Sequence, residues 1–164
     1  MLTAILLEDQ AWVGVSEPRR QEWRLALRDV LETHVLRTER SPLILRLALT
    51  PAAVRFTFEV PGEGAVCEPE LDRTALDPAV EAYAEICRDM GALTPETRGR
   101  LVELERRRKE IHDDGGLLVQ RALDEVGPTH DTARRLFTLL VTLLVDTSSL
   151  PALKMPHGSD PTPA

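Results

Sequence analysis

Asp131-Thr-Ala-Arg-Arg-Leu-Phe-Thr-Leu139, near the carboxyl end of the chain, predicts the start of a buried helix. Aspartate is a favoured N-cap residue, so Asp131 is expected to cap this helix. The apolar face that follows comprises Leu136, Phe137, Leu139 and Leu140. Because residues 136–145 are apolar nearly all round, the helix is expected to lie at the centre of the fold or at an interface.

The composition of the whole chain indicates one soluble domain. Its 164 residues, 43% apolar and 29% charged, are typical of a single globular unit. We expect this domain to span residues 1–147, and the proline-rich residues 148–164 to form a disordered tail. The longest nearly apolar run is about half a membrane span, and no signal-peptide pattern is present. We therefore expect a cytoplasmic protein with no membrane partner.

Charge and cysteine content narrow the classes of function. The net charge of −7 argues against a nucleic-acid partner, because sequence-independent binding needs a basic surface. Two cysteines, Cys67 and Cys87, are too few for a zinc site or a disulfide framework, and both are expected to be reduced. The sequence contains no phosphate-binding loop and no nucleophile elbow. It therefore predicts no cofactor and no metal, and leaves open whether the protein is an enzyme.

The first half of the chain alternates between strand and helix patterns. Residues 2–7 predict a short strand, and a helix is expected to begin near Pro18. Residues 42–60 predict a β-hairpin with a turn at Thr50–Ala53. Alternation places one set of apolar residues on its inner face: Leu43, Leu45, Leu47, Leu49, Val54, Phe56, Phe58 and Val60. One face of the sheet is therefore expected to be buried under helices.

The second half is expected to be helical after a loop over residues 61–76. Asp77-Pro78 predicts a cap and first residue, and Thr94-Pro95 predicts another helix start. Gly115-Gly116 either breaks the helical pattern or allows another backbone to come close. These patterns predict an α+β fold in which four or five helices cover a small antiparallel sheet of about three strands.

The segment Arg106–Gly116 holds the first group of candidate functional residues. Arg108 and His112 are four residues apart and share a helix face, and Asp113 and Asp114 follow the histidine directly. A histidine beside a carboxylate can serve as a base or a ligand, yet the spacing of a paired-histidine metal site is missing. The alternatives are a solvated charged helix, an anion or ligand site, and a metal or catalytic site.

Arg134 and Arg135 form the second candidate group. Two guanidinium groups beside the amides of a helix start can clamp a phosphate or a carboxylate. Asp131 would compete for the same amides. The other interpretation is that both arginines pair with acidic residues elsewhere and hold the last helix in place.

Several of these segments together resemble a known family. Asp131–Leu139, preceded by Arg108-Lys-Glu-Ile-His-Asp-Asp-Gly115, is similar to the C-terminal half of uncharacterised protein family 0262, a group of small bacterial cytoplasmic proteins. Ile5-Leu-Leu-Glu-Asp9 and the hairpin match its N-terminal half more loosely. The resemblance covers roughly residues 2–146 and implies an α+β fold without supplying a reaction.

This chain departs from the family pattern at two positions. The family motif has Asn where this chain has Asp113, and a histidine near the end of its last helix where this chain has Leu144. Any family activity that requires that histidine is not expected here.

We expect a non-enzymatic protein-interaction or regulatory module, with a second copy or another cytoplasmic protein as partner. The alternative is an anion- or metal-assisted site that binds or acts on a phosphorylated small molecule. Its candidate residues are Arg108, His112, Asp113, Asp114, Arg134 and Arg135. This alternative requires the two basic segments to meet in one pocket.

Overall fold

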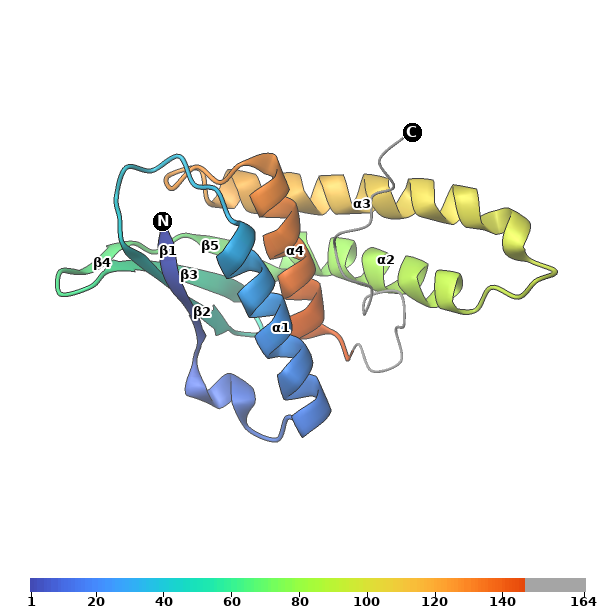
Figure 1. The fold of residues 1–164 in the computed structure, drawn as a ribbon, viewed down its shortest axis with the longest axis horizontal. Helices are drawn as coiled ribbons and strands as arrows, with labels where there is room; N and C mark the ends of the chain where they lie inside the picture. Colours follow the sequence, from blue (N-terminus) through green and yellow to red (C-terminus); the bar gives the residue numbers. More distant parts are fainter. Residues whose placement is uncertain (147–164) are drawn as a thin grey trace.

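The hairpin predicted over residues 42–60 forms the centre of a five-stranded sheet (Figure 1). A computed structural model describes residues 1–146, so the tail predicted over 148–164 lies outside the described residues. The strands are β1 (Leu2–Leu7), β2 (Leu43–Leu49), β3 (Ala53–Val60), β4 (Gly64–Cys67) and β5 (Glu70–Asp72). The helices are α1 (Glu17–Thr33), α2 (Arg73–Gly91), α3 (Leu101–Ala122) and α4 (His130–Leu144). The predicted α+β class is confirmed.

The β2–β3 hairpin has one buried and one exposed face, as its alternation predicts. Its antiparallel register pairs Leu45 with Phe58 and Leu47 with Phe56, and all four side chains are at most 1% exposed. On the outer face Arg46 pairs with Glu59 on the neighbouring strand. Such half-exposed pairs contribute at most about 1 kcal/mol each, so burial of the inner face supplies most of the stability.

The sheet is mixed, whereas the sequence predicted an antiparallel one. β1 pairs with β2 in parallel, with Ile5 opposite Leu45 and Leu7 opposite Leu47. The physical reason is the connection, since α1 lies between these two strands and carries the chain back to the end from which it started. A hairpin turn would have made the pair antiparallel.

The loop predicted over residues 61–76 was wrong in part. It contains β4, β5 and the first turn of α2, which begins at Arg73 and takes Pro78 into its interior. Both short strands add to the same edge of β3, β4 beside Phe58–Val60 and β5 beside Ala53–Arg55. The open edge of β3 gives these segments backbone partners, which outweighs their turn-rich composition.

One other predicted helix start also moved, and one open alternative is settled. The connection between α2 and α3 contains turns and a 3₁₀ helix at Arg98–Arg100. α3 therefore starts at Leu101 and not at Thr94-Pro95. α3 then runs unbroken through Gly115 and Gly116 to Ala122. Of the two roles open to these glycines, the structure therefore shows the close approach of another backbone.

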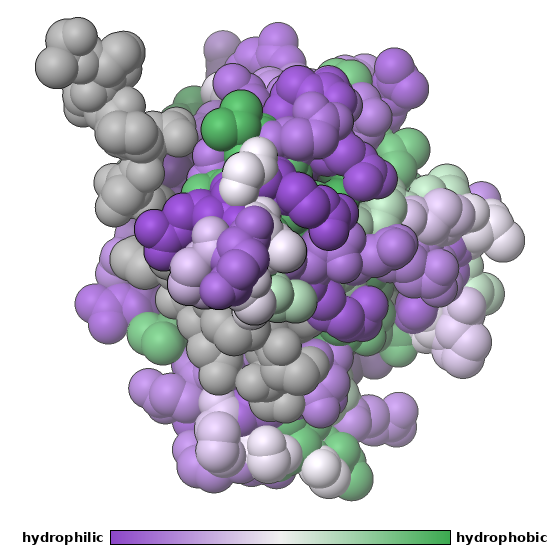
Figure 2. Space-filling model, turned by 90° about the vertical axis from the view of Figure 1, so that its right-hand side faces the viewer, coloured by the Kyte–Doolittle hydropathy of each residue, from purple (hydrophilic) through white to green (hydrophobic). Residues whose placement is uncertain are grey.

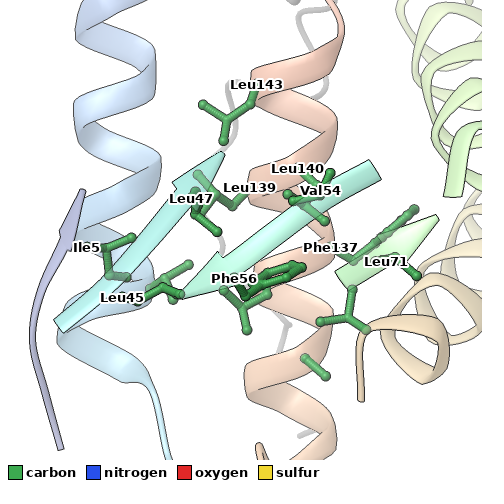
Figure 3. Packing of buried hydrophobic residues seen from close by; sticks show 14 of the residues in the cluster. Ile5, Leu45, Leu47, Val54, Phe56, Leu71, Phe137, Leu139, Leu140 and Leu143 are labelled. Carbon is green, nitrogen blue, oxygen red and sulfur yellow. The ribbon is translucent and has the colours of Figure 1, made fainter. Parts of the chain in front are cut away.

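α4 is the central helix of the fold. It lies beside α1 over the inner face of the sheet, and it also packs on α3 (Figure 1). Nine of its residues are buried, and Figure 3 shows Leu139 and Leu140 among the inward side chains of β2 and β3. Its apolar surface is thus used inside the domain and does not by itself indicate an interface.

The two cysteines give a first testable prediction. Burial raises the pKa of the Cys87 thiol to about 11, and this side chain is fully enclosed. Cys67, at the end of β4, is only half-buried. At pH 8 we expect iodoacetamide to modify Cys67 at least about tenfold faster than Cys87 in the folded protein, because little thiolate is present and accessible at Cys87.

Peptide mapping by mass spectrometry measures both rates in one sample, and the same reaction in urea is the control. Equal rates in the folded state would contradict the burial of Cys87. Comparable rates are expected only after unfolding.

Candidate functional site

The two glycines of α3 bring α4 unusually close. A Cβ added at Gly115 would lie 2.5 Å from the ring of Phe137, and one added at Gly116 would lie 2.6 Å from Cγ of Arg134. Any larger residue at either position would have to displace α4 or its side chains. The glycines therefore set the distance at which the two candidate segments meet.

His112, one turn before the glycines, faces α4 and is hydrogen-bonded through both ring nitrogens. Its Nε2 lies 2.8 Å from Thr138 Oγ1 and 3.0 Å from the Arg134 carbonyl oxygen. Its Nδ1 lies 3.2 Å from Arg134 Nη2. The sequence left open whether the basic segment of α4 reaches His112. The structure shows that Arg134 of this segment contacts it.

These partners assign the hydrogen on the His112 ring. A guanidinium group can only donate, so Nδ1 must accept from Arg134. Nε2 then carries the hydrogen and donates to the Arg134 carbonyl oxygen, an assignment made from the network. The lone pair that a general base would use is thus already occupied by Arg134.

Asp113 places a carboxylate on the same arginine. Its Oδ1 lies 3.0 Å from Arg134 Nε and 3.7 Å from His130 Nε2. The Arg134 Nε–H is not directed at that oxygen, so the contact is an ion pair without a well-formed hydrogen bond. Since Asp113 is 40% exposed, the pair contributes at most about 1 kcal/mol.

Arg135 points away from this cluster. Its Nη1 lies 3.2 Å from Asp29 on α1, and its Nε donates to Asp131 one turn earlier in α4 at 3.0 Å. Neighbouring residues on a helix project in different directions, so Arg134 serves the α3 contact and Arg135 serves the α1 contact. The two guanidinium groups do not form a clamp.

The remaining candidates contribute less to this cluster. Asp114 is exposed, and Arg108 is half-buried with no ion pair to another described residue. Burial raises the pKa of both Tyr83 and Cys87, and the positive charge of Arg108 across the α2–α3 contact offsets only part of that rise. The structure therefore brings together His112, Asp113 and Arg134, and it leaves Asp114 and Arg135 outside.

Tyr83 and Thr138 belong to the same cluster, and the sequence did not single them out as functional residues. The Tyr83 ring lies 5.6 Å from His112 and 5.8 Å from Phe137, edge-on to the latter. Burial raises the pKa of Tyr83 to about 12, so the phenol stays protonated at neutral pH. Tyr83 belongs to the apolar stripe of α2. The sequence pattern of that stripe is the same whether Tyr83 only packs in the core or also takes part in a site.

The chemical capacity of this cluster is limited. Among residues 1–146, no three His, Cys, Asp or Glu side chains are grouped so as to hold a metal ion. The residues around His112 donate hydrogen bonds to one another and accept them from one another. This polar network, beside the ring of Phe137, connects α3 to α4.

The N-cap of α4 lies two residues before Asp131, the cap that the sequence predicted. Thr129 is the N-cap, and its hydroxyl accepts from the Thr132 amide at 3.3 Å. Asp131 lies in the first turn, where it pairs with Arg135. Thr129 has the extended backbone of an N-cap, and Asp131 is already helical.

We expect Thr129→Ala to lower the free energy of unfolding by about 1 kcal/mol, because it removes this cap. Asp131→Ala is expected to cost less than about 0.5 kcal/mol, because an exposed ion pair is weak. Urea denaturation of both variants measures the difference. A larger loss for Asp131→Ala would reassign the cap.

The comparisons with known proteins identify the family. The profile of Uncharacterised protein family (UPF0262) matches residues 1–146. The chain belongs to this family. A UPF0262 protein of Phenylobacterium zucineum is 28% identical over 147 residues, covering 87% of this chain and 91% of that protein. One of Allorhizobium ampelinum is 33% identical over 104 residues, covering 62% and 66% of the two chains.

The UPF0262 match includes every element described above, from β1 to α4. No solved structure matches the chain. Within the described residues, no helix combines the length and the apolar character needed to cross a membrane.

Proposed function

We propose that this UPF0262 protein is a cytoplasmic protein-interaction or regulatory module without catalytic activity of its own. The polar residues at its family signature are engaged with one another across α1, α3 and α4. A surface for a partner must therefore be sought elsewhere. The observation that carries the proposal is a charged helical arm that extends beyond the sheet.

The arm comprises residues 88–109, which are the last turn of α2, the connection after it and the first turns of α3 (Figure 1). Ile86 and Leu104 are each 2% exposed and lie outside the main core cluster. Ile86 lies just before the arm and Leu104 within it, so burial of apolar side chains between α2 and α3 continues into the arm.

The arm carries the opposite charge to the rest of the protein. Residues 88–109 hold seven Arg or Lys against four Asp or Glu, a net charge of +3 in a chain of net charge −7. Arg98, Arg100 and Arg107 are exposed and make no ion pair with another described residue. A basic projection on an acidic protein favours association with an acidic surface.

The surface at this end of the molecule supports polar rather than apolar recognition. Figure 2 views the molecule from that side, and hydrophilic residues cover most of the face. Val102, 78% exposed on α3, stands in the arm among charged neighbours. We therefore propose an acidic cytoplasmic protein as the partner, bound mainly through the arm cations.

A homodimer would bring the arm of one copy to the acidic remainder of another. Light scattering at micromolar concentration separates this case from binding of a different protein. The anion-binding alternative stays a hypothesis. It would have to displace the contacts that His112, Asp113 and Arg134 already make.

An affinity pull-down from the native cell tests the proposal when it compares three forms of the protein. The arm variant carries Arg98→Glu, Arg100→Glu and Arg107→Glu. The matched control carries Arg37→Glu, Arg40→Glu and Arg121→Glu, which reverse three exposed cations outside the arm. Circular dichroism first establishes that all three forms are folded.

We expect wild type and control to retain the same partner and the arm variant to lose it by about tenfold or more, with the interaction weakening as salt rises. Equal retention by the arm variant would contradict the role of the arm. Failure of wild type to retain any partner would contradict the interaction function itself.

A further inference from the structure

A second surface, away from the arm, has the character of a small-molecule site. A groove of about 390 Å³ lies where the end of β1, the start of α1 and the end of α4 meet. Its apolar wall includes Val15, Trp23, Leu49 and Leu143, and its polar side chains include Arg19 and Glu8. The groove combines polar and apolar side chains, and its volume lies within the range of small-molecule binding sites.

Arg19 is a positive charge without a negative partner. Its guanidinium carbon lies 5.2 Å from the centre of the Trp23 ring. Its Nη2 reaches the Leu143 carbonyl oxygen only at 3.5 Å, and its buried Nε has no hydrogen-bond partner. No described carboxylate lies within 4.0 Å of it. Half-buried cations are normally compensated, so this one is available to a ligand anion.

The walls of the groove are held in place before any ligand arrives. Trp23 donates from Nε1 to the Thr142 carbonyl oxygen at 3.2 Å, and its ring lies 5.3 Å from that of Trp12. Arg20 donates to the carbonyl oxygens of Trp12 and Val15 and fixes the segment before α1. A preformed site loses less conformational entropy on binding.

We propose that this groove binds a small amphipathic carboxylate, with its apolar body against Val15 and Leu49 and its carboxylate on the Arg19 guanidinium. Arginine suits this role because its planar donors match a carboxylate and it can stack on an aromatic ring at the same time. Glu8 lines the same groove. It repels a simple anion and attracts the ammonium group of an amino acid.

Intrinsic fluorescence tests the proposal directly, because the chain has two tryptophans: Trp23 lines this groove, and the ring of Trp12 lies 5.3 Å from that of Trp23. Three probes share one branched apolar body. They are 4-methylpentanoate, L-leucine, which adds an ammonium group, and 3-methylbutylamine, which has no carboxylate. The full chain is titrated with each, as wild type, Arg19→Met, Glu8→Gln and the control Arg28→Met, an exposed position on the same helix.

We expect a saturable change with 4-methylpentanoate, L-leucine or both, and none with the amine. Arg19→Met should weaken binding by about tenfold or more, while Arg28→Met leaves it unchanged. Glu8→Gln should tighten the binding of 4-methylpentanoate and weaken the binding of L-leucine. The two acids thus distinguish a ligand of the fatty-acid type from an amino acid. The proposal would be overturned if neither acid gave a saturable change, if wild type bound acid and amine equally, or if folded Arg19→Met kept its affinity.

Discussion

Phe137→Ala is expected to lower the free energy of unfolding by about 3–5 kcal/mol, the largest effect of any single change proposed for this protein. The ring is 0% exposed. It contacts Tyr83 edge-on and lies against His112 and Gly115. Removing it leaves a cavity at the point where α2, α3 and α4 converge, and the helices cannot close that cavity without breaking the polar contacts of His112.

Urea denaturation followed by circular dichroism at 25 °C measures this loss. Val102→Ala is the control, because its side chain is 78% exposed and should change stability by no more than about 0.5 kcal/mol. A loss for Phe137→Ala as small as the control's would mean that the three helices do not meet at this ring.

Gly115→Ala is expected to lower the free energy of unfolding by about 1–2 kcal/mol, although alanine is the better helix former. Relief of the glycine penalty stabilises α3 by about 1 kcal/mol. Against this, the new Cβ would lie 2.5 Å from a fully buried ring. Overpacking of this kind costs about 1–3 kcal/mol, and a contact so short lies at the upper end of that range.

Gly99→Ala is the matched control for this prediction. Gly99 lies in the connection before α3, and nothing lies within 4 Å of the Cβ that alanine would add there. It should be neutral or slightly stabilising in the same urea titration. If Gly115→Ala were stabilising as well, the close approach of α4 would be contradicted.

The sequence predicted the fold best where a regular apolar period coincides with burial. The alternation over residues 42–60 was sufficient to predict the hairpin. The apolar run after Arg135 was sufficient to predict a buried last helix. It failed where a distant partner decides the local structure. Residues 64–72 form strands because the edge of β3 is open, and no local pattern records that edge.

The candidate site was predictable in part, since His112 and Arg134 were both singled out and do meet. Their exact partners were not, because contacts between helices depend on how closely the helices pack. The glycine pair was noticed, but its role became clear only with Phe137 and Arg134 opposite it. The separation of Arg134 from Arg135 follows from helix geometry, because neighbouring residues on a helix project in different directions.

We expect the residues of the family signature to join α3 to α4 through a close contact between the two helices. A double-mutant cycle between Gly115→Ala and Phe137→Leu tests it most directly. If the added methyl and the ring compete for one space, Phe137→Leu should cost less in the Gly115→Ala background, with a coupling of about 1 kcal/mol or more. Additivity within about 0.5 kcal/mol would contradict the claim.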